Sequence, residues 1–169
     1  QLGNKKPKPS KPSEVAPVKV APVAPIVIGP QIIDNYYIWQ KGENFPLSPH
    51  FSSKEMTCHC SYDTCKTQKM SVSMVDKLET VRMELGRALV ITSAFRCSRY
   101  QAHLRDTAVY TVVAQTLSQH ELGNAVDAQP ANRNMDGFLE IASKYFDSIG
   151  LAKTFLHLDL RKGHRRWNY

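Results

Sequence analysis

Two short motifs constrain this chain more than any other feature of its sequence. Residues 118–127 read SQHELGNAVD, and residues 155–159 read FLHLD. Together they contain His120, Asp127 and His157, which are residue types that bind zinc. Three protein ligands leave the fourth position of a tetrahedral zinc ion for water, as a hydrolytic metal requires. Either motif alone is common in proteins without a metal, but the pair predicts a zinc site and a hydrolase.

The second motif has the alternation of a β-strand. Leucines occupy positions 156, 158 and 160, and the alternate positions hold Phe155, His157, Asp159 and Arg161. Because successive side chains of a strand point to opposite faces, we expect the leucines to face a core. A metal ligand, a carboxylate and a guanidinium then share the other face.

The first motif predicts a turn followed by another strand. Alternation over residues 124–129 places Ala125 and Asp127 on one face, and the small Ala125 leaves room near the metal. Gly123 permits a turn before this strand, because glycine tolerates backbone conformations that other residues avoid. We therefore expect His120 and Asp127 to converge across the turn.

These motifs also resemble a known family. The patterns S-Q-H-x-x-G-x-A-x-D and F-x-H-x-D-x-R, preceded by ITSAFR at residues 91–96, are similar to those of the zinc D-Ala-D-Ala metallopeptidases. These enzymes cut peptidoglycan peptides, include phage endolysins and have a fold that resembles hedgehog signalling domains. The resemblance runs from Phe45 to Trp167 and implies that Arg96 grips a substrate carboxylate and that Ser118 supports the substrate site. It also implies a set of zinc ligands: His120, Asp127 and His157.

The general base is less well defined than the ligands. Many relatives place an acidic residue three positions before the last zinc histidine, where this chain has Thr154. Asp159 follows His157 on the same strand face and is the preferred catalytic base, with Glu121 as the fallback. Alternatively, Asp159 only orients a ligand or pairs with Arg161, as carboxylates around metal sites commonly do.

The loop beside the predicted cleft departs from the family pattern. Relatives often carry N-x-x-V-G-G-A before the S-x-H motif, whereas the corresponding region here begins QAHLRD at residues 101–106. The glycine pair is absent, so the sequence does not select which peptidoglycan bond is cut. His103 in this loop is a reserve candidate for proton transfer, although a lone loop histidine is more often simply solvated.

Composition and charge limit the classes of partner that this protein is expected to bind. The 169 residues are 42% hydrophobic, which is enough for one core, and the formal net charge is +7. A basic chain is attracted to polyanions, including nucleic acid, anionic membrane surfaces and bacterial wall polymers. The sequence lacks an RNA-binding pattern and a helix-turn-helix, which disfavours nucleic acid. No apolar run approaches the roughly 20 residues of a transmembrane helix.

Residues 1–44 differ from the rest of the chain. Lysine and repeated Ala-Pro-Val segments predict an extended tether or anchor, because proline fixes its backbone and lacks an amide donor. The predicted zinc peptidase-like domain then occupies residues 45–169. The apolar residues of the arm are too many for a pure linker, so we expect part of it to pack on something and an assembly partner to order it. They are Ile26, Val27, Ile28, Ile32, Ile33, Tyr36, Tyr37 and Trp39.

The sequence has four cysteines: Cys58, Cys60, Cys65 and Cys97. An even number in a wall-directed protein favours up to two disulfides, and three pairings are possible. A structural zinc site is the next alternative, although the first pair lacks the two-residue gap of common zinc knuckles. Free buried thiols remain a third interpretation.

Periodicity predicts an α+β fold in which helices flank a largely antiparallel sheet. An apolar stripe predicts a helix over residues 71–85, ended by Gly86. A strand over residues 89–95 then delivers Arg96. A short helix is expected over residues 98–104 and a strand over 110–113. Helical spacing returns over residues 136–149, with Gly150 as the stop.

Two functions are compatible with these features. The first is a zinc-dependent peptidoglycan peptidase, either a D,D-carboxypeptidase or endopeptidase or an L-alanyl-D-glutamate endopeptidase, acting on stem peptides. It would work in the cell wall or envelope, or as part of a phage virion. The second is a virion or envelope structural protein that keeps the fold and binds without cutting. The zinc ligands and Arg96 favour the first, and Thr154 favours the second.

Overall fold

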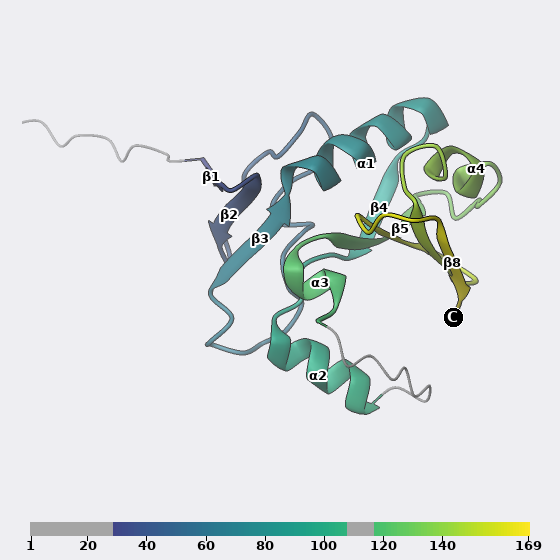
Figure 1. The fold of residues 1–169 in the computed structure, drawn as a ribbon. Helices are drawn as coiled ribbons and strands as arrows, with labels where there is room; N and C mark the ends of the chain where they lie inside the picture. The colour runs from purple at the N-terminus through teal and green to yellow at the C-terminus, as the bar shows by residue number, and fades with distance from the viewer. Residues whose placement is uncertain (1–28, 108–116) are drawn as a thin grey trace, which may run out of the picture.

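The protein is described by a computed structural model that covers residues 29–107 and 117–169. Within these residues the strands form two sheets (Figure 1). The smaller sheet is antiparallel, has the order β1-β2-β3, and consists of β1 (Gln31–Ile33), β2 (Tyr36–Gln40) and β3 (Thr67–Ser71). The larger sheet has the order β4-β5-β7-β6-β8, and its strands are β4 (Leu89–Ser93), β5 (Ala125–Pro130), β6 (Ser148–Leu151), β7 (Leu156–Asp159) and β8 (Arg165–Asn168).

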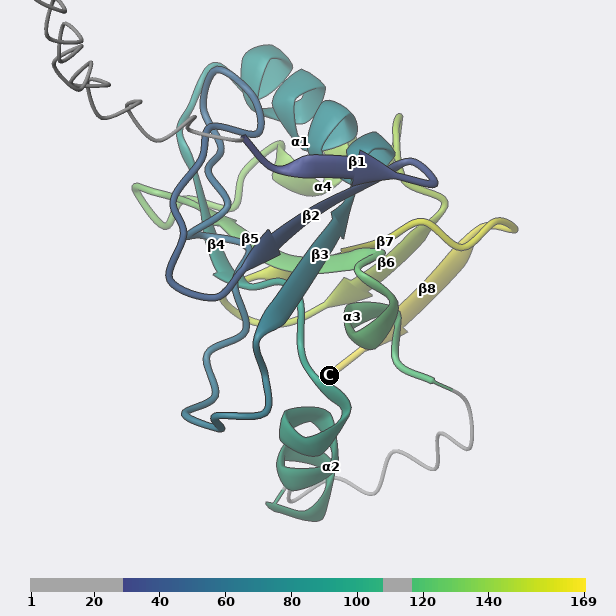
Figure 2. The ribbon, with the colours of Figure 1, turned by 90° about the vertical axis from the view of Figure 1, so that its left-hand side faces the viewer.

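The helices lie on both sides of the larger sheet. They are α1 (Val72–Leu85), α2 (Ser98–Thr107), α3 (Gln119–Leu122) and α4 (Phe138–Ala142). In Figures 1 and 2, α1 and α4 lie above the sheet, and α2 and α3 lie below it. Neighbouring strands of this sheet are antiparallel except for β6 and β8, which are parallel. The predicted α+β class and largely antiparallel sheet are confirmed.

The hydrophobic core lies between α1 and the larger sheet. The predicted stripe of α1 is buried through Val75, Leu78 and Val81, while Leu85 packs at its edge. Gly86 ends the helix in the left-handed conformation, as the sequence predicts, and its amide bonds the carbonyl of Arg82. The sheet supplies alternate residues to the same core: Val126, Ala128, Ile149, Leu156 and Leu158.

The prediction for residues 136–149 is wrong in part. The helix ends at Ala142, and Gly150 lies within β6 instead of stopping a helix. Apolar spacing could not separate the two elements, because Phe146 and Ile149 are buried in either arrangement. Gly150 pairs with Trp167 of β8, and a Cβ at this position would approach the indole ring to 2.6 Å. The glycine is therefore explained by close packing in the sheet.

The folded unit begins before residue 45. β2 pairs along its length with β3, and Trp39 is buried with its indole nitrogen donating to Thr57. Residues 36–40 of the predicted arm therefore pack on the domain. β1 joins them by pairing with β2, but its Ile32 and Ile33 side chains are exposed. Residues 1–28 of the arm and the predicted strand at 110–113 lie outside the described residues. Among the described helices, none has the length and apolar character needed to cross a bilayer.

Candidate metal centre

Three side chains from separate elements meet below the larger sheet. His120 comes from α3, Asp127 from β5 and His157 from β7, and all three are buried. Nε2 of His120 lies 3.1 Å from Nδ1 of His157 and 3.4 Å from Oδ1 of Asp127. The remaining distance, from Nδ1 of His157 to Oδ1 of Asp127, is 2.9 Å. The structure therefore brings together the three ligands that the motifs predict.

Strand pairing sets two of these positions. Asp127 and His157 are opposite each other in the antiparallel register of β5 and β7, so their side chains share one face. The neighbouring pair, Val126 and Leu158, points to the core on the other face. The alternation in both motifs thus separates core residues from site residues.

A capped turn sets the third position. Ser118 precedes α3, and its hydroxyl accepts the amide of His120 at 3.3 Å. The carboxylate of Glu121 accepts the amide of Ser118 at 3.0 Å, which completes a capping box. Gly123 ends the helix with φ +73°, so the chain reverses into β5 as predicted. Ser118 and Glu121 hold the helix that carries His120.

Gly123→Ala should destabilise the protein. A left-handed conformation costs an L-residue roughly 1–2 kcal/mol. The new Cβ would also lie 2.9 Å from the backbone oxygen of Lys69. We expect a larger loss of unfolding free energy than in Gly86→Ala, where φ is +63° but no atom lies within 4 Å. Urea denaturation of both variants measures the difference. Equal losses of unfolding free energy would show that the contact with Lys69 does not contribute to the effect.

The three converging atoms suit a tetrahedral zinc ion. Zinc–nitrogen and zinc–oxygen distances of about 2.0–2.1 Å place tetrahedral ligands about 3.3–3.4 Å apart. The separations here are 2.9, 3.1 and 3.4 Å. Nδ1 of His120 lies 2.7 Å from the carbonyl of Ala94, and Nε2 of His157 lies 3.3 Å from Oδ2 of Asp159. If each imidazole donates through its outer nitrogen, its inner nitrogen has a lone pair available for a metal.

Electrostatics favour the metal-binding forms of two ligands. Burial would raise the pKa of Asp127, but hydrogen bonds and charge from both histidines hold it well below its usual range. Burial is also the main effect on His120 and lowers its pKa. Burial alone would lower the pKa of His157, but hydrogen bonds to Asp127 and Asp159 outweigh this effect and raise the pKa above its ordinary value. An anionic carboxylate and a neutral imidazole are the forms that bind zinc.

Comparison with known proteins adds the family. The family model described as Peptidase M15 matches residues 49–159, which is more than half of the chain. The chain belongs to the peptidase M15 family. This confirms the resemblance to the zinc D-Ala-D-Ala metallopeptidases, and the matched segment contains all three converging residues. No curated protein and no solved structure matches the chain.

In this M15 protein, Arg96 contacts Asp127, the one carboxylate among the three converging side chains. Its Nη2 donates to Oδ2 of Asp127 at 2.5 Å, and its Nε donates to Ser93 at 2.8 Å. Nη1 donates to Gln101 at 3.3 Å. A guanidinium has five N–H groups, so two have no partner among the described residues. The predicted contact with a substrate carboxylate remains a prediction, and the structure adds a contact with Asp127.

Asp159 lies behind His157. It is fully buried and contacts Nε2 of His157, whereas Nδ1 is the nitrogen that faces the other two ligands. Its carboxylate accepts the backbone amide of Arg161 at 2.9 Å and Nη2 of the same residue at 2.6 Å. Burial would raise the pKa of Asp159, but these hydrogen bonds keep it below its ordinary range. The geometry favours the orienting role over the predicted role as base.

The other residues considered for proton transfer are engaged in another contact or exposed to solvent. Glu121 is used in the capping box, and Thr154 is exposed in the turn before β7. His103 is exposed on α2. Among the described residues, therefore, the structure offers no unengaged carboxylate from this set at the converging atoms.

Two aromatic residues beside the site were missed by the sequence analysis. The ring of Trp167 lies 5.4 Å from that of His157, and the ring of Tyr169 lies 6.3 Å away. The guanidinium of Arg161 lies 5.4 Å from the centre of the Trp167 ring. These residues reach the site because β8 pairs parallel with β6, a long-range pairing with no local sequence signal. The one sequence feature related to this pairing is Gly150, which lies opposite Trp167 and leaves room for its ring.

Proposed function

We propose that this M15 protein is a zinc-dependent peptidase that hydrolyses peptide bonds in bacterial peptidoglycan. The observation that carries the proposal is the triangle of donor atoms from His120, Asp127 and His157, with both outer imidazole nitrogens held by acceptors. A zinc ion bound there would lower the pKa of a water molecule and polarise the scissile carbonyl.

The chain's own residues supply the ligands and their orientation. Asp127 provides the negative charge, and Arg96 fixes its outer oxygen. The carbonyl of Ala94 and the carboxylate of Asp159 set the rotations of His120 and His157. The remaining N–H groups of Arg96 suit a substrate carboxylate, because the guanidinium fork matches the two carboxylate oxygens.

The substrate class follows from the family and the charge. We propose a peptidoglycan stem peptide, cut either as a D,D-carboxypeptidase or endopeptidase or as an L-alanyl-D-glutamate endopeptidase. The net charge of +7 supports attachment to an anionic wall polymer. The corresponding location is the cell wall or envelope, or a phage virion in which residues 1–28 act as a tether to an assembly partner.

Asp159→Asn separates the two roles of this carboxylate. If Asp159 orients His157, the variant should bind zinc about 10- to 100-fold more weakly and recover turnover when zinc is added. If Asp159 is the base, turnover should stay low at full zinc occupancy. Zinc titration with turnover measured in the same samples distinguishes the outcomes. We expect recovery, because both oxygens of Asp159 contact Arg161 and the carboxylate faces the outer nitrogen of His157.

A second candidate function is a virion or envelope structural protein that binds wall peptides without cutting them. It is favoured by the engagement of Asp159 and Glu121 and by the exposed Thr154 at the family's acidic position. Digestion of muropeptides followed by mass spectrometry tests both candidates. A peptidase gives new fragments whose masses identify the bond, whereas a binding protein retains intact muropeptides and yields no fragments.

A further inference from the structure

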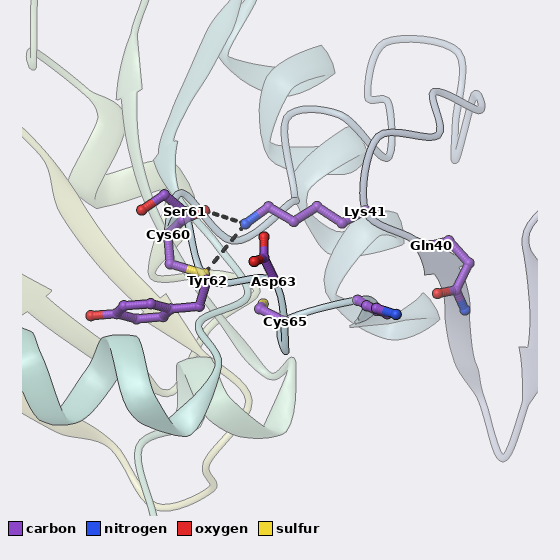
Figure 3. A pocket seen from close by; sticks show the side chains of 8 residues that line it. Gln40, Lys41, Cys60, Ser61, Tyr62, Asp63 and Cys65 are labelled. Atoms are coloured by element: carbon purple, nitrogen blue, oxygen red, sulfur yellow. Dashed lines mark hydrogen bonds between the residues drawn. The ribbon is translucent and has the colours of Figure 1, made fainter.

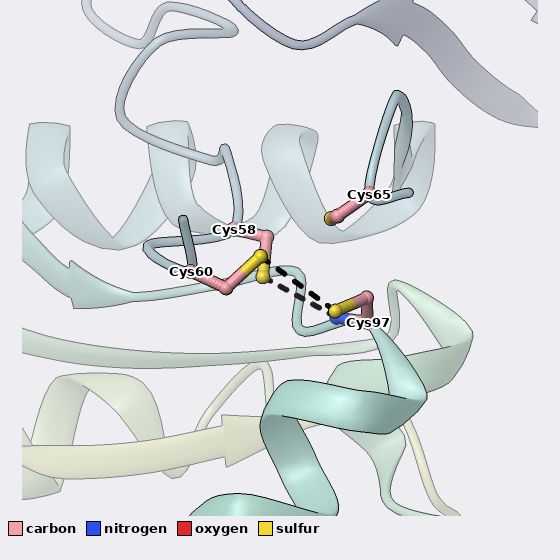
Figure 4. Close-up of side chains that lie close together, drawn as sticks. All are labelled: Cys58, Cys60, Cys65 and Cys97. Carbon is pink, nitrogen blue, oxygen red and sulfur yellow. Dashed lines mark hydrogen bonds between the residues drawn. The ribbon is translucent and has the colours of Figure 1, made fainter. Parts of the chain in front are cut away.

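A second cluster of metal-binding side chains lies apart from the histidines. Cys58, Cys60 and Cys65 come from the segment before β3, and Cys97 directly precedes α2. Figure 4 shows the four side chains pointing toward one another from these two segments. Their sulfur atoms all lie within 4.8 Å of one another. The first three cysteines are buried and the fourth is half-buried.

The sulfur geometry does not support the disulfides that the sequence favours. All four cysteines are free, and Sγ of Cys60 lies 3.7 Å from Sγ of Cys97. A disulfide requires about 2.05 Å. Tetrahedral zinc with bonds of about 2.3 Å to sulfur places its ligands about 3.8 Å apart. The observed separation of this pair matches two ligands of one zinc ion.

The groups around the cluster suit thiolates. The amide of Cys97 donates to Sγ of Cys58 at 3.4 Å, and the side-chain amide of Gln68 donates to Sγ of Cys65 at 3.4 Å. Gln68 is completely buried, and its oxygen accepts the amide of Cys58 at 2.8 Å, which fixes its orientation. Donors of this kind hold metal ligands in place and stabilise negative charge on sulfur.

A lysine also approaches the cluster. The ammonium group of Lys41 lies 3.3 Å from Sγ of Cys60 and donates to the carbonyl of the same residue (Figure 3). Four thiolates around a divalent zinc ion leave two negative charges, which a nearby cation offsets in part. A pocket of about 410 Å³ is lined by Lys41, Cys60 and Cys65. The pocket therefore lies beside two of the four cysteines.

We propose that Cys58, Cys60, Cys65 and Cys97 bind a structural zinc ion. Four protein ligands close the coordination sphere, so this site has no position for substrate or water and serves stability. The site is distinct from the proposed catalytic zinc and does not depend on peptidase activity.

The cysteine site would also support the catalytic ligands. Cys97 follows Arg96, which contacts Asp127, and Ala94 in the same segment accepts from His120. The amide of Phe95 donates to the carbonyl of Met56, next to the first cysteines. A zinc ion would therefore fasten the segment of residues 58–65 to the segment that positions two ligands of the other site.

Zinc content per chain tests the proposal without an activity assay. The full chain is purified under reducing conditions, and zinc is measured by inductively coupled plasma mass spectrometry. The double variant His120→Ala/His157→Ala should retain about one zinc equivalent per chain, because closed sites of four thiolates bind zinc tightly. A mercurial thiol reagent should release that zinc. Replacing the zinc by cobalt should give sulfur-to-metal charge-transfer absorption in the near ultraviolet.

Cysteine and histidine variants complete the test. Cys58→Ser/Cys97→Ser should lose the zinc equivalent that the double histidine variant retains, whereas His59→Ala should keep it, because the exposed His59 is excluded from the ligand set. The measurement on the double histidine variant decides the matter even if the cysteine variant fails to fold. Absence of zinc from that variant, or disulfides in a non-reducing peptide map, would overturn the proposal. Loss of zinc in His59→Ala would overturn the four-cysteine ligand set.

Discussion

We expect His157→Ala to lower the rate of the proposed stem-peptide hydrolysis by on the order of 1,000-fold or more, because it would remove a proposed zinc ligand and leave the metal weakly held. His157 lies at the centre of the site, with Nδ1 facing Asp127 and His120 and Nε2 facing Asp159. Alanine removes both contacts at once. The loss should appear in kcat, measured by chromatography of muropeptide products, together with a loss of bound zinc.

His164→Asn is the matched control for this variant. His164 is exposed after Gly163 and has φ +28°, a region that asparagine tolerates better than most residues. Its activity and zinc content should equal those of the unmodified protein. If His157→Ala retains its catalytic zinc and cleaves at the normal rate, His157 is not a ligand and the proposed centre is wrong.

Arg96→Lys should lower kcat/KM by on the order of 100-fold for substrates with a free carboxylate, because lysine keeps the charge but loses the planar fork. The charge next to Asp127 is preserved, so zinc content should change little. The lower kcat/KM should come mainly from a higher KM. Steady-state kinetics on a carboxylate substrate and its amidated analogue separate substrate binding from support of Asp127.

Arg105→Lys provides the comparison, because Arg105 is exposed on α2 and, among the described residues, its one ion pair is a surface contact with Asp106. Its kinetics should be unchanged. The variant at Arg96 should cleave the two substrates at similar efficiency, whereas the unmodified protein should prefer the free carboxylate. An unchanged preference in Arg96→Lys would show that this arginine supports Asp127 only.

The strand faces of the candidate ligands and the turn before β5 were predictable because they rest on short-range rules. Alternation in each motif fixes which face Asp127 and His157 occupy, and Gly123 marks the turn that returns His120 to them. The stripe of α1 and its glycine stop were predictable for the same reason. Each of these features depends on residues close together in the chain. The pairing of β5 with β7, which sets Asp127 opposite His157, is long-range, and the family resemblance implied that these two residues meet.

Features that depend on distant pairing were not predictable in the same way. The apolar residues at the start of β6 fit both helical and strand periods, so their spacing predicts the end of a helix where the structure has a strand. The approach of Trp167 to His157 depends on the parallel pairing of β8 with β6. The four cysteines were known, but sequence spacing could not show that Cys97 lies beside the other three. Tertiary structure supplies these juxtapositions.

The roles of the carboxylates near the candidate ligands could be assigned only from atomic contacts. Asp159 shares a strand face with His157, which suits a base equally well as an orienting group. The contacts of Asp159 with the outer nitrogen of His157 and with the guanidinium of Arg161 favour the orienting role. Glu121 likewise follows His120 in sequence but caps its own helix. Sequence position identified these carboxylates, and hydrogen bonds identified what they hold.

The most direct test of the central claim measures zinc content and muropeptide cleavage on one sample of the full chain. The account predicts new peptide fragments from the zinc-loaded protein, none after treatment with a chelator, and their return when zinc is added back. Cleavage that survives complete removal of zinc would contradict it, as would a folded protein that contains zinc at His120, Asp127 and His157 and leaves every muropeptide intact.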